Sequence, residues 1–121
     1  MKNLLFFLLA FFLFLYGCSP ENDGIRIRIK NTSTFNYENV YVNTSGGEYD
    51  YGNLQAGETS VYREFELAYQ YAYIRLEVNS DTVAIQPIDY VGETPLKNGK
   101  YTYEVTTDGT RQNLGLVFKV D

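Results

Sequence analysis

Residues 25–30 read Ile-Arg-Ile-Arg-Ile-Lys, an unbroken alternation of apolar and basic side chains. A period of two is typical of a β-strand that buries one face, so we expect the three isoleucines to point into a core. The alternation returns in later segments, and no stretch after residue 24 keeps the 3.6-residue period of an amphipathic helix. The sequence therefore predicts an all-β domain.

Turn-forming residues separate the segments that read as strands, beginning with a polar break at residues 31–36. Asn79-Ser80-Asp81 and Asp108-Gly109 are typical hairpin turns. Seven or eight short strands in about 100 residues indicate a single sandwich of two packed sheets, with a small closed β-barrel as the alternative. The expected later strands are residues 40–42, 48–51, 59–67, 68–78, 82–86, 100–107 and 112–120.

Residues 95–105 (Pro-Leu-Lys-Asn-Gly-Lys-Tyr-Thr-Tyr-Glu-Val) resemble the start of the penultimate strand in immunoglobulin-like and fibronectin-type domains. In those domains a tyrosine ring packs inward while its hydroxyl caps the preceding corner. The resemblance assigns this role to Tyr101 and implies an immunoglobulin-like β-sandwich. The chain has no Trp and one Cys, which excludes a true antibody-type domain with its core disulfide.

An apolar run precedes the predicted domain. Lys2 supplies a positive charge, and all twelve residues from Leu4 to Leu15 are apolar. As a helix they would rise about 18 Å, short of a hydrocarbon core about 30 Å thick, which favours a cleaved signal peptide over a membrane span. Residues 15–18 (Leu-Tyr-Gly-Cys) resemble a bacterial lipobox. The resemblance implies that Cys18 is lipidated and begins the mature chain.

Cys18 is the only cysteine, so no intrachain disulfide can form, and lipidation would consume an otherwise unpaired thiol. Residues 18–24 are polar and turn-prone, which indicates a tether, and their acidic character resembles the export signals of Bacteroidota surface lipoproteins. The expected organisation is a lipoprotein signal peptide over 1–17, a lipidated N-terminus and tether over 18–24, and a β-sandwich over 25–121. The expected location is the cell envelope, at the outer membrane, in the periplasmic or the surface-exposed leaflet.

Acidic residues outnumber basic ones. Without Lys2 the mature chain would carry 9 basic and 15 acidic residues, a net charge of −6. A negative charge of this size argues against nucleic-acid binding and against electrostatic adhesion of the domain to anionic lipid.

The composition also excludes several kinds of catalysis. The chain has no histidine, so it cannot form a Ser-His-Asp or Cys-His arrangement or an ordinary zinc site, and it lacks a Walker-type phosphate loop. We therefore expect no enzyme, no metal and no cofactor. Three pairs of neighbouring carboxylates are expected to be solvated surface groups: Glu48 with Asp50, Glu64 with Glu66, and Asp89 with Glu93.

Tyrosine is the most unusual part of the composition, with 12 in the chain. Tyr69, Tyr71 and Tyr73 alternate with the residues of segment 68–78 that are expected to be buried, so they would form a stripe on the opposite face. Such a stripe is a candidate binding surface for a glycan or a peptide. The alternative is that the tyrosines only stabilise the sheet through cross-strand aromatic pairs.

Two shorter segments carry further expectations. The loop over residues 87–95 is unusually apolar for a solvent-exposed connection, and we expect Ile88 and Tyr90 to close one end of the sandwich. Asp81-Thr82-Val83 resembles the acceptor motif for O-glycosylation in Bacteroidota, which makes Thr82 a candidate glycosylation site.

Together these features predict a bacterial lipoprotein held in the lipid bilayer through Cys18. Its domain is expected to be a non-catalytic structural, assembly or interaction module of the cell envelope, with an envelope protein or a glycan as partner. The alternative function is a glycan- or peptide-binding module that uses the face of Tyr69, Tyr71 and Tyr73.

Overall fold

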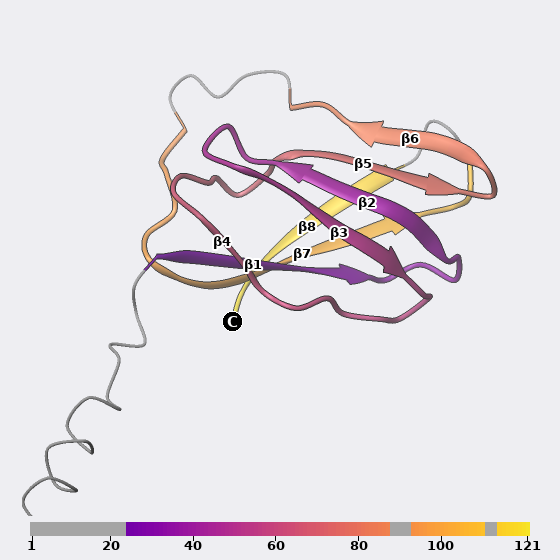
Figure 1. Cartoon of the computed structure of the whole chain (residues 1–121), viewed down its shortest axis with the longest axis horizontal. Coiled ribbons are helices and arrows are strands. Elements are labelled where there is room, and N and C mark those ends of the chain that lie inside the picture. Colours follow the sequence, from indigo (N-terminus) through magenta and orange to yellow (C-terminus); the bar gives the residue numbers. More distant parts are fainter. Residues whose placement is uncertain (1–23, 88–92, 111–113) are drawn as a thin grey trace, which may run out of the picture.

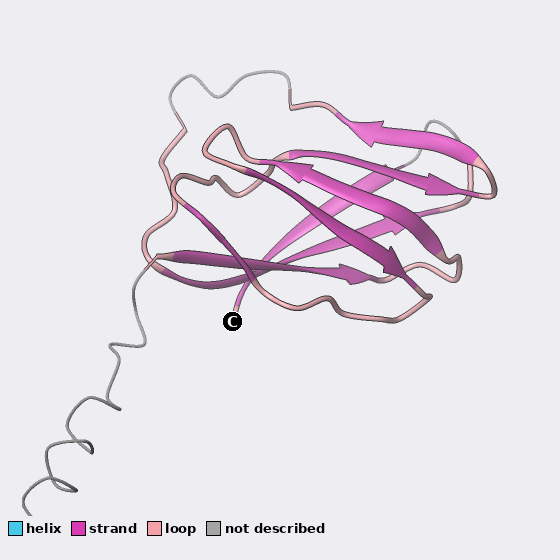
Figure 2. Cartoon of the chain, viewed as in Figure 1, coloured by secondary structure: helices cyan, strands magenta, loops and turns pink. Residues whose placement is uncertain are grey.

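Every regular element in the described part of the chain is a β-strand (Figures 1 and 2). The computed structural model describes residues 24–87, 93–110 and 114–121. Eight strands form two four-stranded sheets, and the core lies between them. In chain order the strands are β1 (Ile25–Asn31), β2 (Tyr37–Asn43), β3 (Glu48–Leu54), β4 (Arg63–Phe65), β5 (Tyr73–Val78), β6 (Asp81–Ile85), β7 (Gly99–Thr107) and β8 (Leu114–Val120).

The strand order is β4-β1-β7-β8 in one sheet, called here the β1 sheet, and β3-β2-β5-β6 in the other, the β2 sheet. Neighbouring strands are antiparallel except β1 and β7, which run parallel. The predicted β-sandwich is confirmed, and the closed-barrel alternative is excluded for the described residues because each sheet ends in two edge strands. The chain shares the packed-sheet architecture of immunoglobulin-like domains, while its two four-stranded sheets differ from the ABED and CFG sheets of constant domains.

The core follows the predicted alternation. Ile25, Ile27 and Ile29 expose 4%, 0% and 0% of their surface, and the residues between them are only partly buried. Burying a side chain of this size is worth about 1.5–3 kcal/mol, so β1 contributes much of the stability of its sheet. Later residues predicted to point inward are buried as well: Ala72, Ile74, Leu76, Val78, Tyr101, Tyr103 and Val105.

Tyr101 lies in the corner position that the resemblance assigns to it. Its hydroxyl donates a hydrogen bond to the carbonyl oxygen of Lys97 at 2.7 Å. Its ring is stacked on Phe118 of β8, with the ring centroids 5.4 Å apart. The predicted tyrosine corner at the start of the penultimate strand is therefore confirmed.

The strand predicted over residues 59–67 is regular only at β4. Before β4, backbone pairing with β1 is limited to an isolated bridge between Thr59 and Lys30, where the N–H of Ser60 donates to the carbonyl oxygen of Ile29 at 2.8 Å. Side chains supply other partners: the Oγ atom of Ser60 accepts the N–H of Ile29 at 2.9 Å. The hydroxyl of Tyr51 donates to the carbonyl oxygen of Ile27 at 2.7 Å. The prediction was too long because an alternating pattern does not reveal where side chains substitute for backbone partners.

The strand predicted to begin at Ala68 begins only at β5, five residues later. The carbonyl oxygen of Ala68 accepts the N–H of Leu96 at 2.8 Å, and that of Tyr69 accepts the hydroxyl of Tyr103 at 2.5 Å. These long-range hydrogen bonds occupy carbonyl oxygens that a strand would offer to its neighbour. The segment before β5 is thus held by contacts that the sequence pattern does not encode.

The polar residues after Lys30, expected only to interrupt the strand, form a turn in which Asn31 and Ser33 are buried. Asn31 is fully buried, and its Nδ2 atom donates to the carbonyl oxygens of Phe35 (2.7 Å) and Leu54 (3.1 Å). Its Oδ1 atom accepts the N–H and the hydroxyl of Ser33, at 2.9 and 2.7 Å. Asn31 therefore links the end of β1 to the end of β3.

Candidate binding surface

Four tyrosines use their hydroxyls to join distant segments of the sandwich. Burial raises the pKa of Tyr37 and of Tyr51 above the ordinary value of 10.0, so both are protonated donors at neutral pH. Part of the tyrosine excess is thus structural. The four hydroxyls donate to backbone carbonyl oxygens: Tyr37 to Val105 (2.9 Å), Tyr51 to Ile27 (2.7 Å), Tyr101 to Lys97 (2.7 Å) and Tyr103 to Tyr69 (2.5 Å).

Tyr73, the last residue of the predicted stripe, lies beside Tyr41 of β2. The two rings meet edge to face, with centroids 6.1 Å apart. The guanidinium group of Arg75 lies 4.7 Å from the centroid of the Tyr41 ring. The Tyr41 hydroxyl donates to the Glu48 carboxylate, and this hydrogen bond raises the pKa of Tyr41. Cross-strand packing of this kind stabilises an exposed sheet face.

Tyr71 has different neighbours from Tyr73. It lines a pocket of about 590 Å³ between the edge strands β6 and β8, with walls from both sheets. Tyr71 and Tyr73 are both partly buried and flank the fully buried Ala72, so the predicted alternation holds here although β5 begins only at Tyr73. The pocket itself was not predicted, since its walls come from segments far apart in the sequence. The lining is mostly apolar: Gln70, Tyr71, Ile85, Pro87, Leu114, Leu116 and Phe118.

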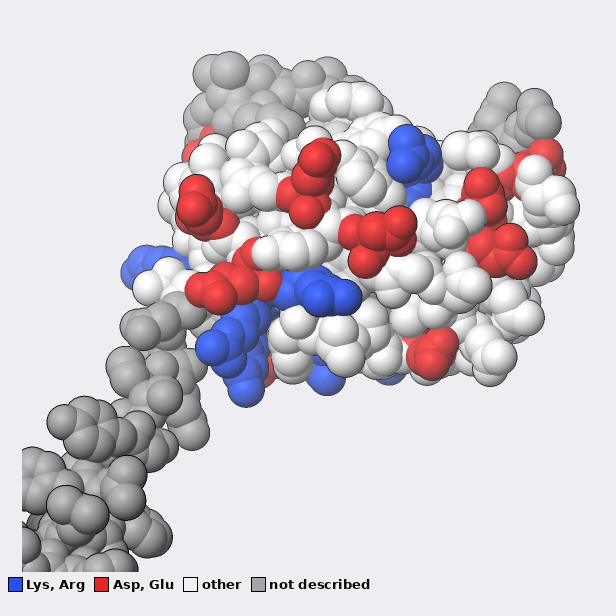
Figure 3. Space-filling view, in the orientation of Figure 1, with Lys and Arg blue, Asp and Glu red and all other residues white. Residues whose placement is uncertain are grey.

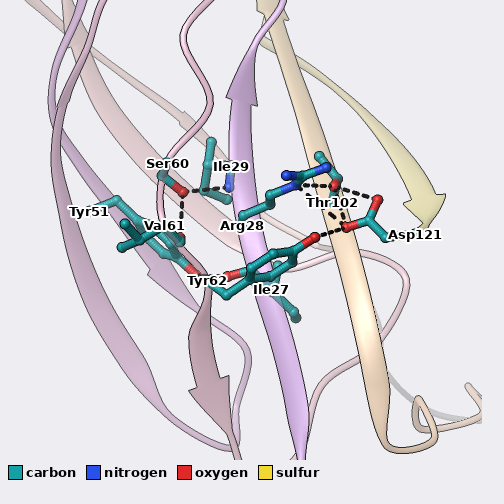
Figure 4. A network of polar contacts seen from close by, with 9 residues as sticks. All are labelled: Ile27, Arg28, Ile29, Tyr51, Ser60, Val61, Tyr62, Thr102 and Asp121. Atoms are coloured by element: carbon teal, nitrogen blue, oxygen red, sulfur yellow. Dashed lines mark hydrogen bonds and ion pairs between the residues drawn. The ribbon is translucent and has the colours of Figure 1, made fainter. Parts of the chain in front are cut away.

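A polar network on the β1 sheet is centred on the carboxylate of Asp121 (Figure 4). The hydroxyls of Thr102 and Tyr62 donate to this carboxylate at 2.8 and 2.7 Å. The Nε atom of Arg28 donates to the Thr102 hydroxyl at 2.9 Å and lies 3.5 Å from the carboxylate. Burial and the hydrogen bond to Asp121 raise the pKa of Tyr62. The network joins residue 121 to β1 and β7. No short motif in the sequence predicts it.

The outer faces of the two sheets differ in charge. On the β2 sheet, carboxylates outnumber cations, whereas the β1 sheet gathers more cations than carboxylates. Figure 3 shows acidic side chains spread over the viewed face, with most of the basic ones toward its lower left and one basic group toward its upper right. The outer face of the β1 sheet carries Arg26, Arg28, Lys30, Lys100 and Lys119 with Glu64 and Glu104, and that of the β2 sheet carries Glu38, Glu48, Asp50 and Glu77 with Arg75.

Thr82, the candidate glycosylation site, is exposed on the edge strand β6. Its side chain is therefore accessible to a modifying enzyme. The carboxylates of Glu48, Asp50, Glu64 and Glu66 are exposed, as expected for solvated surface groups. Among the described residues, no group of three or more His, Cys, Asp or Glu side chains is arranged to hold a metal ion.

Several predicted features lie outside the described residues. They are Cys18 with the signal peptide and most of the tether, and Ile88, Asp89 and Tyr90 of the apolar loop. Within the described ranges, no helix is long and apolar enough to cross a membrane.

Comparison with known proteins gives no assignment. No protein-family model, curated protein sequence or solved structure matches the chain at a significant level.

Proposed function

We propose that the chain is a lipid-anchored protein of the bacterial cell envelope, whose β-sandwich serves as a non-catalytic structural or interaction module. The observation that carries the proposal is the sequence Leu-Tyr-Gly-Cys at residues 15–18, directly after a twelve-residue apolar run. Cys18 is also the only thiol in the chain, so a lipid attached there leaves none free to oxidise. The outer membrane is the proposed location.

The position of β1 supports a close link between anchor and domain. Ile25 begins β1, so residues 18–24 alone connect the lipid to the first strand. Seven extended residues span at most about 25 Å, which keeps the sandwich near the membrane surface. A second acyl chain makes such an anchor durable, because a single chain binds a bilayer only marginally.

The chemistry of the described residues favours a structural or interaction role over catalysis. Every buried side-chain nitrogen or oxygen in the described ranges has a hydrogen-bond partner. The raised pKa values of Tyr37, Tyr41, Tyr51 and Tyr62 have structural causes, namely burial or a hydrogen bond to a carboxylate. In active sites, by contrast, residues with a shifted pKa typically lie in a cleft, where the shifted pKa serves the reaction.

Lipid labelling of variants tests the proposal. Cells that express the chain are grown with a labelled fatty acid, and membrane and soluble fractions are compared. The unchanged chain should carry label and sediment with membranes, while Cys18→Ala should lose both properties. Ser19→Ala, a change to the adjacent residue, should keep both. Label retained by Cys18→Ala would refute the anchor, and co-purifying proteins in detergent would identify an envelope partner.

A second candidate function is glycan or peptide binding by Tyr69, Tyr71 and Tyr73. The observation in its favour is the apolar pocket that Tyr71 lines. Replacing all three tyrosines with Ser should abolish binding to a glycan or peptide library without unfolding the domain. Tyr49→Ser, a change to a tyrosine that is 36% exposed on β3, is the matched control. Unchanged binding by the triple variant would remove this candidate.

A further inference from the structure

The four edge strands of the sandwich differ in how well they are protected against pairing. Unpaired strand edges attract other strands, and proteins usually blunt them by short length, bulges or charge. β4 has three residues and β6 has five, and the register of β3 with its neighbour β2 is interrupted by shifts. β8 has seven residues in unbroken register with β7. It is the one edge in the described part of the chain without such protection.

The composition of β8 also favours pairing. Its sequence, Leu-Gly-Leu-Val-Phe-Lys-Val, has a single charge, at Lys119, and no proline. Val117 and Val120 are 47% and 73% exposed, among the largest values for hydrophobic residues in the described ranges. A regular, apolar, weakly charged edge of this length is the kind to which a further strand adds.

The hydrogen bonds of the chain end show which backbone groups of β8 face outward. The N–H of Asp121 donates to the carbonyl oxygen of Lys100 on β7. Because backbone groups alternate in direction along a strand, those of residues 119, 117 and 115 also face β7. The N–H and carbonyl groups of residues 114, 116, 118 and 120 therefore face the open edge. In the described ranges, no strand pairs with this edge.

We propose that β8 pairs antiparallel with β8 of a second copy of this chain, about a two-fold axis at Val117. In this register Leu116 faces Phe118 of the other copy, and Leu114 faces Val120. These four residues carry the outward backbone groups, so their pairs are the hydrogen-bonded ones and the Val117 pair at the axis is not. The two β1 sheets would then join into one continuous sheet of eight strands.

The register is chosen by overlap and charge. An axis at Val117 pairs all seven residues, and it places Lys119 opposite Gly115, where no charge opposes it. An axis at Lys119 would place two lysines face to face and pair fewer residues, which is unfavourable. A parallel, in-register pair would also put Lys119 opposite itself. The antiparallel pair about Val117 is thus the self-complementary arrangement of this sequence.

Disulfide trapping tests the register in the full chain, kept in mild detergent and mildly oxidised. In a non-hydrogen-bonded pair the two Cα atoms lie about 4.5 Å apart, within the range that a disulfide bridges. Val117→Cys should therefore form a cross-linked dimer. Lys119→Cys should not, because in this register the two introduced residues are about 14 Å apart along the strand. The unchanged chain, with Cys18 alone, gives the baseline.

Two outcomes would overturn the proposal. One is an amount of cross-linked dimer for Val117→Cys that does not exceed that of the unchanged chain. The other is equal cross-linking of Val117→Cys and Lys119→Cys, which would indicate random collision. Val61→Cys is the control for exposure alone, since Val61 is 66% exposed outside β8.

Charge substitution at the axis gives a measurement that needs no cysteine. Light scattering should find a dimer for the unchanged chain and half that mass for Val117→Lys or Val117→Glu, because like charges then meet at the axis. Mixing these two variants should restore the dimer mass. Val61→Lys should stay dimeric. A monomeric unchanged chain, or a dimer that both variants preserve, would refute the pairing. The test does not involve lipidation, so its result is independent of the anchor at Cys18.

Discussion

Replacing Asn31 with Ala should destabilise the domain more than any surface change. The side chain of Asn31 is fully buried and takes part in four hydrogen bonds. Three of these bonds join the end of β1 to Ser33 and Phe35 in the following turn, and the fourth joins it to Leu54 at the end of β3. Alanine fills less space and makes none of these bonds. The substitution therefore leaves buried backbone groups without partners and opens a small cavity.

The size of the effect follows from which partners can be replaced. The Ser33 hydroxyl keeps a second acceptor, the carbonyl oxygen of Phe35 at 3.2 Å. The N–H of Ser33 and the carbonyl oxygen of Leu54 lose a buried hydrogen bond. Each buried polar group left unpaired costs about 1–3 kcal/mol, so the expected loss of unfolding free energy is about 2–6 kcal/mol. That is a large fraction of the roughly 5–15 kcal/mol typical of a domain.

Urea unfolding followed by circular dichroism measures this loss. With a urea dependence of about 2 kcal/mol per M, a loss of about 4 kcal/mol lowers the midpoint by about 2 M. Asn98→Ala is the control, because Asn98 is exposed just before β7, and it should change stability by no more than about 0.5 kcal/mol. Equal midpoints for Asn31→Ala and the unchanged chain would refute the buried network.

Three further predictions concern single contacts. Tyr101→Phe removes the hydrogen bond to Lys97 and should lower the unfolding free energy by about 0.5–1.5 kcal/mol; an unchanged urea midpoint would remove the corner role. Gly46→Ala places a Cβ atom 2.5 Å from the backbone oxygen of Leu67, so the turn after β2 must shift and the thermal midpoint should fall; an unchanged midpoint would contradict this close approach. The folded-state pKa of Tyr51 is raised above 10.0, so its contribution to stability is complete below about pH 10 and is lost as the pH rises further, by about 1.4 kcal/mol per pH unit. Urea midpoints measured above pH 10 should fall less steeply for Tyr51→Phe than for the unchanged chain, and equal slopes would refute the assignment.

Local patterns in the sequence predicted the parts of the fold that depend on burial alone. The alternation of Ile25, Ile27 and Ile29 fixes which face of β1 is buried. Successive side chains of a strand point to opposite faces, so only one orientation of β1 buries all three isoleucines. Tyr101 was also predicted correctly, because a corner tyrosine acts over only four residues. Each of these two features depends only on residues that lie close together in the sequence.

Features that depend on distant partners were missed. The pattern did not show that Ser60 substitutes for a backbone partner of β1, so the fourth strand was predicted too long. It likewise did not show that Tyr71 lines a pocket with residues of β8, because those residues lie far along the sequence from Tyr71. The Asp121 network joins residues up to 93 positions apart, a range at which a single sequence carries no signal.

The tyrosine content illustrates the same limit. Composition marked tyrosine as unusual and suggested a binding face. Four other tyrosines, Tyr37, Tyr51, Tyr101 and Tyr103, donate their hydroxyls to backbone carbonyl oxygens of other segments, in a chain whose single cysteine allows no internal disulfide. Each bond adds about 1 kcal/mol, a useful amount for a domain with a modest core.

Intact-mass measurement of the protein extracted from native membranes tests the proposed anchor most directly. The account predicts a chain that starts at Cys18, without residues 1–17, and that carries the added mass of diacylglyceryl and acyl groups on this residue. A chain with an unmodified Cys18 thiol, or one that retains residues 1–17, would contradict it.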